Sequence, residues 1–260
     1  IQCYLDAKRD AVQPSTFAGY EKLGRGLVSL VGKNKDITDI DDSTITDLTN
    51  KLKERGDSDN TIRHYIIMLN GVLQWNCCSF RAEPPKIEKY RGNFYTVGEL
   101  QKLLAAAEGT PVEIVLYIAS YLGLRRSEIC GLRWDNVNLE NHTIRVCEKL
   151  VQYNSLSGNQ YDHSSKMKTA YSDRILPIPE NLYYNLLQEP TNEGYIAHMP
   201  DGRPMQPKYI SQVFDRLLKK HNLRKIRFHD LRHTCASLLL QSGVDMKTIQ
   251  IILGHGQYST

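Results

Sequence analysis

The chain has 260 residues, of which 41% are apolar, and it carries 33 lysines and arginines against 29 aspartates and glutamates. This length suffices for one large or two ordinary domains with hydrophobic cores. No apolar run reaches the roughly 18 residues that a membrane-spanning helix needs, which excludes a helical membrane protein and favours a soluble one. Because the net charge of +4 is only mildly basic, nucleic-acid binding has to be argued from local clusters of charge.

The cysteines and histidines show no spacing typical of metal ligands. None of the six cysteines belongs to a C-x-x-C motif, and several stand among apolar residues, where cysteine packs as a small hydrophobe. His229 and His233 stand four residues apart but lack the glutamate of an H-E-x-x-H motif. We therefore expect a reduced, cytoplasmic protein with no disulfides, no metal site and no cofactor.

Residues 1–85 are predicted to form a helical domain. A residue that can cap a helix, serine, threonine or aspartate, precedes the second and the fourth helix of this region. The proportions are those of a four-helix unit. The four predicted helices, recognised by apolar residues at helical spacing, lie at Ile1–Arg9, Phe17–Val31, Leu48–Arg55 and Ile62–Trp75.

Residues 86–93 have the composition of a linker. They follow Glu83-Pro84-Pro85 and are polar, charged and without periodicity. A hinge between two lobes is what a protein needs in order to clamp a rod-shaped ligand such as duplex DNA. A plain domain boundary explains the same residues equally well. In either case we expect a second domain of residues 94–260.

The second domain is predicted to combine helices with a small β-sheet or hairpin. Thr96 and Glu99 form a capping box before one helix, and Pro111 begins a nearly all-apolar core helix. Alternating residues predict strands at Thr143–Gln152 and Arg174–Ile178, separated by a long flexible loop. Two further helices are predicted at Pro179–Leu187 and Tyr209–His221. The expected fold class is therefore mainly α with a small β component.

Two adjacent arginines, Arg125 and Arg126, directly follow the core helix. A guanidinium close to a hydrophobic core needs a partner. Glu128 stands three residues after Arg125, so that an ion pair between them would satisfy this need without any further role.

A basic run precedes the end of the chain. From Lys208 to Arg232 there are eight lysines and arginines against Asp215 and Asp230. A solvated basic helix face is the usual explanation of such a run, but contact with a DNA backbone is favoured here by the motif that follows. The candidate DNA-binding residues are Lys208, Lys219, Lys220, Arg224, Lys225 and Arg227.

The stretch from Ile226 to His255 predicts two amphipathic helices, separated near Gly243 and ending at Leu253-Gly254-His255. His229 and Arg232 are three residues apart and project from one helix face. A guanidinium flanked by imidazoles suits an anion such as phosphate. Taken alone, His229 and Arg232 are explained about equally well as a pair of surface residues that binds no ligand.

Four boxes resemble those of tyrosine recombinases, a family that includes phage and conjugative-transposon integrases. The resemblance is strong over residues 94–260, whereas residues 1–88 resemble the family's core-binding domain only in length, opening and position. The boxes are Gly123-Leu124-Arg125-x-Ser127-Glu128, Lys168-Thr169-x-x-Ser172-x-Arg174-x-x-Pro177, His229-Asp230-Leu231-Arg232 and Leu253-Gly254-His255.

The resemblance implies a helical N-terminal core DNA-binding domain and a mixed α/β catalytic domain of the tyrosine recombinase type. It implies a site-specific DNA recombinase that cuts and rejoins DNA through a 3′-phosphotyrosyl intermediate without a metal, to integrate or excise a mobile element. Glu128 would support the first arginine, and Lys166 competes with Lys168 for the role of general acid. The implied catalytic residues are Arg125, Lys168, His229, Arg232 and His255.

The nucleophilic tyrosine of the family stands further from the L-G-H histidine than Tyr258 does. Tyr258 matches a variable position, so we expect the nucleophile to follow Thr260 and the chain, which begins at Ile1 rather than at methionine, to be a fragment. The resemblance also implies double-stranded DNA as partner, a dimer on one site, a homotetramer on paired sites, an accessory directionality factor and no membrane. The expected location is the cytoplasm of a bacterium, on DNA, with a bacterial or phage gene.

Three other interpretations remain open at this point. A type IB topoisomerase shares the catalytic set, but the wording from Lys168 to Arg174 disfavours it. A DNA-binding regulator without activity would not require all five catalytic positions. An unrelated helical interaction protein would make the boxes coincidental.

Overall fold

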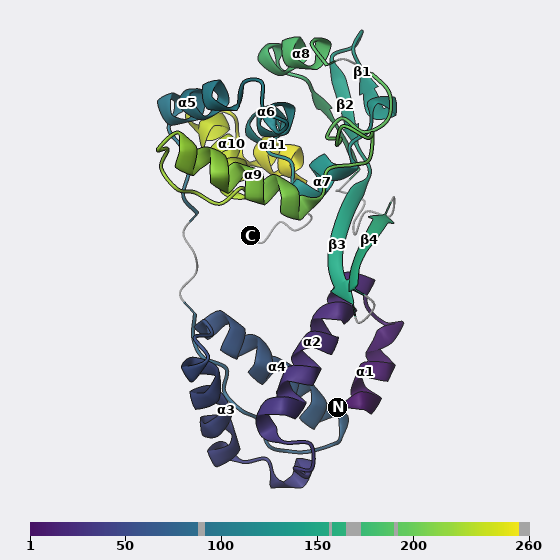
Figure 1. The fold of residues 1–260 in the computed structure, drawn as a ribbon, viewed down its shortest axis with the longest axis vertical. Coiled ribbons are helices and arrows are strands. Elements are labelled where there is room, and N and C mark those ends of the chain that lie inside the picture. Colours follow the sequence, from purple (N-terminus) through teal and green to yellow (C-terminus); the bar gives the residue numbers. More distant parts are fainter. Residues whose placement is uncertain (88–91, 156–157, 165–172, 190–191, 255–260) are drawn as a thin grey trace. The chain divides into compact units, whose positions relative to one another are not determined.

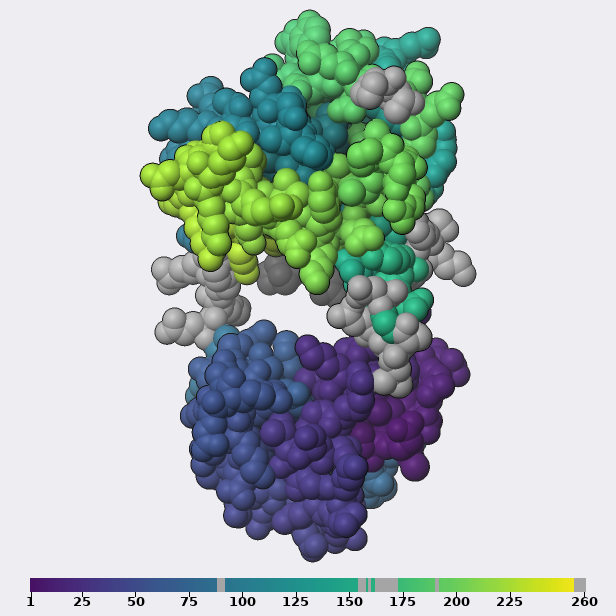
Figure 2. Space-filling view, in the orientation of Figure 1, coloured from purple at the N-terminus to yellow at the C-terminus, as the bar shows by residue number. Residues whose placement is uncertain are grey.

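The computed structural model describes residues 1–87, 92–155, 158–164, 173–189 and 192–254. The described chain is helical apart from two small sheets, which confirms the predicted fold class of mainly α with a small β component (Figure 1). It divides into two compact units, residues 1–90 with 153–160 and residues 91–152 with 161–260. Each unit has its own core of buried apolar side chains, and Figure 2 shows the surface that covers each core.

The described residues of the first unit form four α-helices, as the apolar spacing predicts. Its buried core includes Leu27, Leu48 and Leu73, which are no more than 1% exposed. The prediction that Ser15 or Thr16 caps the second helix is wrong, because the helix begins at Pro14, which takes the first position, where a missing N–H costs nothing. The elements are α1 (Gln2–Arg9), α2 (Pro14–Val31), the short turn η1 (Ile37–Asp39), α3 (Asp42–Glu54) and α4 (Asp59–Trp75).

The chain that leaves α4 is tied back to this helix. Asn70 Nδ2 donates to Ala82 O at 2.8 Å, and its Oδ1 accepts a hydrogen bond from Ala82 N at 3.0 Å. Arg63 Nη1 donates to Pro85 O at 3.0 Å. Residues 82–85 are therefore held by the first unit.

The second unit is built around α6, which packs against α5, α8 and α10. These neighbours explain why α6 is apolar on nearly every side, with Val115, Leu116 and Ile118 fully buried. Pro111 lies in the turn before α6 rather than in its first turn. The helices are α5 (Val97–Ala107), α6 (Glu113–Tyr121), α7 (Arg126–Gly131), α8 (Glu180–Leu187), α9 (Pro207–Lys220), α10 (Asp230–Gln241) and α11 (Met246–Leu253), with the short turn η2 (Trp134–Asn136).

The strands form two separate sheets. An antiparallel sheet has the order β1 (Val137–Asn138), β2 (Thr143–Val146) and β5 (Arg174–Pro177), and β3 (Lys149–Ser155) pairs with β4 (Gly158–Ser164). The single strand predicted at 143–152 is thus wrong, because the chain changes partner from β5 to β4 after Val146. The predicted loop is also wrong where β3 and β4 occupy it.

The capping box at the start of α5 is confirmed. Thr96 Oγ1 accepts from Glu99 N at 3.3 Å, and Glu99 Oε2 accepts from Thr96 N at 2.8 Å. We expect Thr96→Ala to lower the free energy of unfolding by about 1 kcal/mol, because it removes one of these caps. Urea denaturation measures the change. Thr96→Ser keeps the hydroxyl, and an equal loss in both variants would show that the cap does not stabilise α5.

Candidate active site

Arg125 stands at the start of α7, directly after the turn at Gly123 and Leu124. Its Nη1 donates to Glu128 Oε1 at 2.7 Å, and its backbone N donates to Glu128 Oε2 at 2.9 Å. The ion pair that the spacing suggested therefore exists. The side chain remains 36% exposed, so that part of the guanidinium faces solvent while Glu128 holds the other part.

Arg232 lies in the first turn of α10 and is only 3% exposed. Its Nη1 donates to Gly123 O at 2.8 Å and its Nη2 to Leu253 O at 2.5 Å. Burial and the nearby charge of Arg125 lower its pKa to about 10. The guanidinium nevertheless stays protonated at neutral pH and joins the first arginine box to the end of α11.

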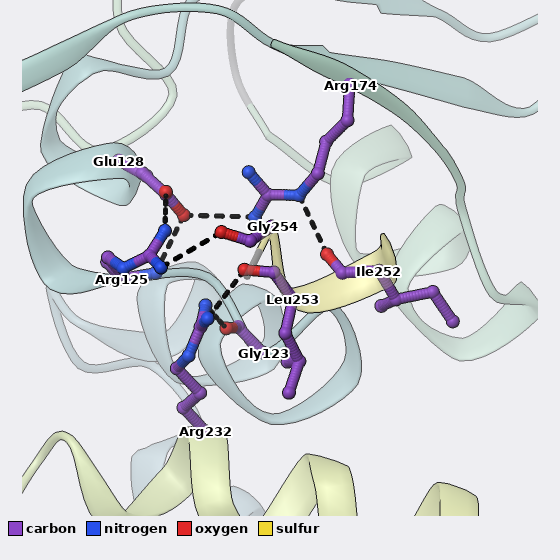
Figure 3. A network of polar contacts seen from close by, with 8 residues as sticks. All are labelled: Gly123, Arg125, Glu128, Arg174, Arg232, Ile252, Leu253 and Gly254. Carbon is purple, nitrogen blue, oxygen red and sulfur yellow. Dashed lines mark hydrogen bonds and ion pairs between the residues drawn. The ribbon is translucent and has the colours of Figure 1, made fainter. Parts of the chain in front are cut away.

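Three arginines converge on the C-terminal end of α11 (Figure 3). Arg174 Nε donates to Ile252 O at 2.7 Å, Arg232 Nη2 to Leu253 O, and Arg125 Nη2 to Gly254 O at 3.1 Å. The last carbonyls of a helix have no partner within the helix and carry partial negative charge. The guanidinium groups therefore satisfy carbonyls that would otherwise be left unpaired, and they fix the point where the chain turns toward residue 255.

Glycine is favoured at position 254 for two reasons. Its φ of +67° lies in the left-handed region, which a side chain disfavours. A Cβ at this position would also lie 2.9 Å from Arg174 Nη1. The predicted end of the helix at Leu253-Gly254 is confirmed.

Glu128 is buried between Arg125 and Arg174, whose Nη2 donates to its Oε2 at 3.1 Å. Burial acts to raise the pKa of this carboxyl, but Arg174 foremost and then Arg125 outweigh it, so that the pKa is lowered. The carboxylate is thus ionised at neutral pH. With Arg232 close by, three cations surround one anion, which leaves an excess of positive charge.

Arg125 lines a cleft of about 470 Å³. Arg126, Arg227 and His229 also line this cleft, and neutral groups such as Gln152 contribute donors. Arg126 Nη1 also donates to Ser211 Oγ across it. Clustered guanidinium groups with forked donors suit an oxyanion such as a phosphate.

His229 lies immediately before α10 and is exposed. Its ring centroid is 5.4 Å from that of His233, with the ring planes nearly perpendicular. Desolvation of the ring, and then the proximity of His233, Arg232 and Arg227, lower the pKa of His229 below its ordinary value of 6.5. The imidazole is therefore mainly neutral at pH 7 and able to accept a proton.

We expect an NMR titration of the DNA-free protein to give His229 a midpoint below pH 6.5. Adding duplex DNA should raise this midpoint, because a phosphate in the cleft offsets the positive charges that oppose protonation. His229→Gln assigns the resonance. A midpoint at or above 6.5 without DNA would contradict the described environment.

Three of the five predicted catalytic residues, Arg125, His229 and Arg232, come from two boxes that the fold brings together. Lys168 and His255 lie outside the described residues, as do the competitor Lys166 and Tyr258. Their predicted roles therefore stay predictions.

The predicted DNA-binding residues are all exposed, but two of them also serve the fold. Arg224 Nε donates to Glu99 Oε1 at 2.6 Å, and its guanidinium lies 4.9 Å from the ring centre of Tyr95. Arg227 Nη2 donates to Asp230 Oδ1 at 2.9 Å. The exposed set is Lys208, Lys219, Lys220, Arg224, Lys225 and Arg227.

Arg174 belongs to the lysine box without a predicted role, and Arg126 stands at a variable position of the first arginine box. Its place in the lysine box was the one signal that pointed to Arg174. Nothing in the local sequence indicates that this strand residue is buried beside Glu128. Within the described ranges no three potential ligands are grouped to hold a metal ion, and no helix there is long and apolar enough to span a membrane.

Residues 93–260 match the model of the phage integrase family. The chain belongs to this family. The integrase is 26% identical to a XerC-like tyrosine recombinase of Caldanaerobacter subterraneus, over 98% of this chain and 74% of the relative. It is also 26% identical to the tyrosine recombinase XerA of Pyrococcus horikoshii, over 81% of this chain and 70% of the relative.

Solved structures confirm the fold of the integrase. The Tn1549 transposon integrase in complex with transposon right end DNA superposes with a TM-score of 0.80 at 24% identity, covering 98% of this chain and 91% of that one. A lambda integrase dimer bound to a core site superposes with a TM-score of 0.73 at 17% identity, covering 99% and 95%. The predicted tyrosine recombinase fold and the predicted enzyme class, a site-specific DNA recombinase, are thereby confirmed.

Proposed function

We propose that the integrase cuts and rejoins duplex DNA through a 3′-phosphotyrosyl intermediate, in order to integrate or excise a mobile element. The observation that carries this proposal is that Arg125 and His229, from separate elements, line one cleft with Arg126 and Arg227, while the buried Arg232 holds Gly123 O and Leu253 O next to the residues around Arg125. Two guanidinium groups beside one phosphate stabilise the negative charge that grows on its non-bridging oxygens during displacement. Membership of the phage integrase family and the DNA complexes of the structural neighbours support it.

The proposed roles follow from the chemistry of each side chain. Arg125 and Arg232 hold the non-bridging oxygens, and the mainly neutral His229 orients the nucleophilic tyrosine or takes its proton. Lys168 protonates the leaving 5′ oxygen, and His255 binds the phosphate. The tyrosine conserves the energy of the broken ester in its own phosphate bond. Guanidinium and imidazole groups supply the charge stabilisation, so that the reaction proceeds without a metal.

We further propose that residues 1–85 form a core DNA-binding domain, residues 86–93 a linker and residues 94–260 the catalytic domain, which together clamp the duplex. The assembly would be a dimer on one site and a homotetramer on paired sites, with an accessory directionality factor. The exposed basic residues of α9 and of the segment after it supply phosphate contacts. Support comes from their charge and exposure and from the neighbours that carry DNA.

We expect the affinity for duplex DNA to fall steeply with salt, because each neutralised phosphate releases counterions. Replacing both Lys219 and Lys220 by glutamine should reduce the slope of log K against log salt by about 0.9 for each phosphate that the variant no longer neutralises. Fluorescence anisotropy between low and moderate salt measures the slope.

The matched control is Arg203→Gln, which removes an exposed cation outside the basic run, paired with Asp201 in a turn. Its slope should equal that of the wild type. A salt-independent binding constant would contradict binding through phosphates. An unchanged slope in the double variant would remove the end of α9 from the DNA interface.

A further inference from the structure

Arg174 is a buried cation whose contacts include residues far apart in the sequence. It is the first residue of β5, its side chain is 5% exposed, and it does not line the cleft. Its Nε reaches Ile252 O at 2.7 Å and its Nη2 reaches Glu128 Oε2 at 3.1 Å (Figure 3). One planar guanidinium thus joins the sheet, the first arginine box and the end of α11.

Stability alone is a weak reason for this arrangement. Desolvating a guanidinium and a carboxylate costs several kcal/mol, and a well-packed apolar pair is often as stable. The protein interior tolerates the Arg174–Glu128 pair because each group has further hydrogen bonds. The arrangement is better explained by what the two groups hold in place.

Both side-chain contacts of Arg125 depend on groups that Arg174 holds. Arg125 Nη1 donates to Glu128, and the other oxygen of that carboxylate accepts from Arg174. Arg125 Nη2 donates to Gly254 O, two residues after the carbonyl that Arg174 holds at Ile252. The guanidinium plane of Arg174 also lies against the backbone of Gly254, where a Cβ would meet it. The orientation of Arg125 is therefore fixed at two points, and Arg174 stands behind both.

We propose that Arg174 is a positioning residue that orients the Arg125 guanidinium toward the scissile phosphate. The inference rests on the proposed function, since it needs a phosphate at Arg125. Its physical basis is that catalytic charge stabilisation requires donors fixed in place before the reaction, which depends on the residues behind them. Displacement of a catalytic group by about 1 Å can cost on the order of 10²-fold in rate.

The test compares two DNA substrates with full-length integrase. One carries the natural scissile phosphodiester, and the other a methylphosphonate, in which a methyl group replaces a non-bridging oxygen and removes the negative charge. A variant that fails to neutralise phosphate charge is less impaired on the neutral substrate. A variant that is merely misfolded is equally impaired on both. A misfolded fraction lowers the cleavage of both substrates by the same factor, so that the ratio of the two losses does not depend on it.

Arg174→Gln should cleave the phosphodiester about 10²-fold more slowly than the wild type in a single turnover. Its loss of rate on the methylphosphonate should be smaller by at least about tenfold. Arg125→Ala should show the same contrast. The matched control is Arg145→Gln, which breaks an exposed ion pair with Asp173 on the same sheet, next to Arg174. It should cleave both substrates at nearly the wild-type rate.

Equal losses for Arg174→Gln on both substrates, with the contrast present in Arg125→Ala, would overturn the positioning role and leave the proposed function intact. A wild-type rate in Arg174→Gln would overturn it as well. Absence of the contrast in Arg125→Ala would instead overturn the proposed role of Arg125, and this inference with it.

Discussion

Replacing Arg125 or Arg232 by alanine in the full-length integrase is expected to reduce covalent DNA cleavage by about 10² to 10³-fold. The reason is that each guanidinium is proposed to act on charge that develops in the transition state, where loss of one such donor costs on the order of 3–4 kcal/mol. DNA affinity should change far less, because binding is spread over many phosphates. Single-turnover cleavage and anisotropy on the same duplex measure the two effects.

The two variants differ in how cleanly they report on chemistry. Arg125 is partly exposed, so that its loss leaves mainly Glu128 with one partner fewer. Arg232 is buried, and its loss leaves the carbonyls of Gly123 and Leu253 without their donor, which also lowers stability. The thermal unfolding of Arg232→Ala is therefore measured together with its cleavage rate. Cleavage at the wild-type rate by either folded variant would remove that arginine from the active site.

Lys168→Ala is expected to block departure of the 5′ oxygen, with a loss similar in size to that of an arginine variant. A substrate with sulfur in place of the scissile 5′-bridging oxygen has a leaving group that needs no proton, so it should restore cleavage to this variant. Arg125→Ala should not be restored, because its defect lies in the charge of the phosphate. Cleavage rates on the oxygen and sulfur substrates measure the difference.

Lys166→Ala is the matched control, because it removes the same charge two residues away. It should change affinity modestly and leave the chemistry alone. Restoration of Lys166→Ala by the sulfur substrate, with Lys168→Ala indifferent to it, would move the general acid to Lys166.

The helices were predictable because their signals are local. Apolar spacing and caps such as Thr96 with Glu99 depend on residues within one or two turns, and the structure confirms them. The end of α11 was predictable for the same reason, since glycine is strongly favoured in the left-handed backbone conformation at Gly254.

The sheet was predicted less well because strand pairing is decided by distant segments. Alternation in the run of residues 143–152 holds through Val146 and lapses at Cys147, but the sequence does not say that the chain changes its partner there from β5 to β4. Similarly, Arg224 belongs to a basic run by sequence, and only the fold places it against Glu99 and Tyr95.

The candidate site shows the same division. The boxes with Arg125 and with His229 and Arg232 were identified by resemblance, and their meeting at one cleft is a result of the fold. The role of Arg174 could not be read from the sequence, because its partners Glu128 and Ile252 lie 46 and 78 residues away.

In the proposed reaction the integrase becomes linked to the 3′ phosphate of a cut strand. This linkage is tested by incubating full-length integrase with a duplex that is labelled on the strand to be cut and nicked a few nucleotides beyond the scissile phosphate. Cleavage then releases a short fragment with a 5′ hydroxyl, which diffuses away, so that the covalent intermediate cannot be rejoined. We predict a denaturation-resistant protein–DNA species that carries the label of the 3′-phosphate side, forms in the presence of a chelator and forms about 10² to 10³-fold more slowly with Arg125→Ala. A species linked to the 5′ phosphate, or cleavage that leaves no covalent species, would contradict the proposed reaction.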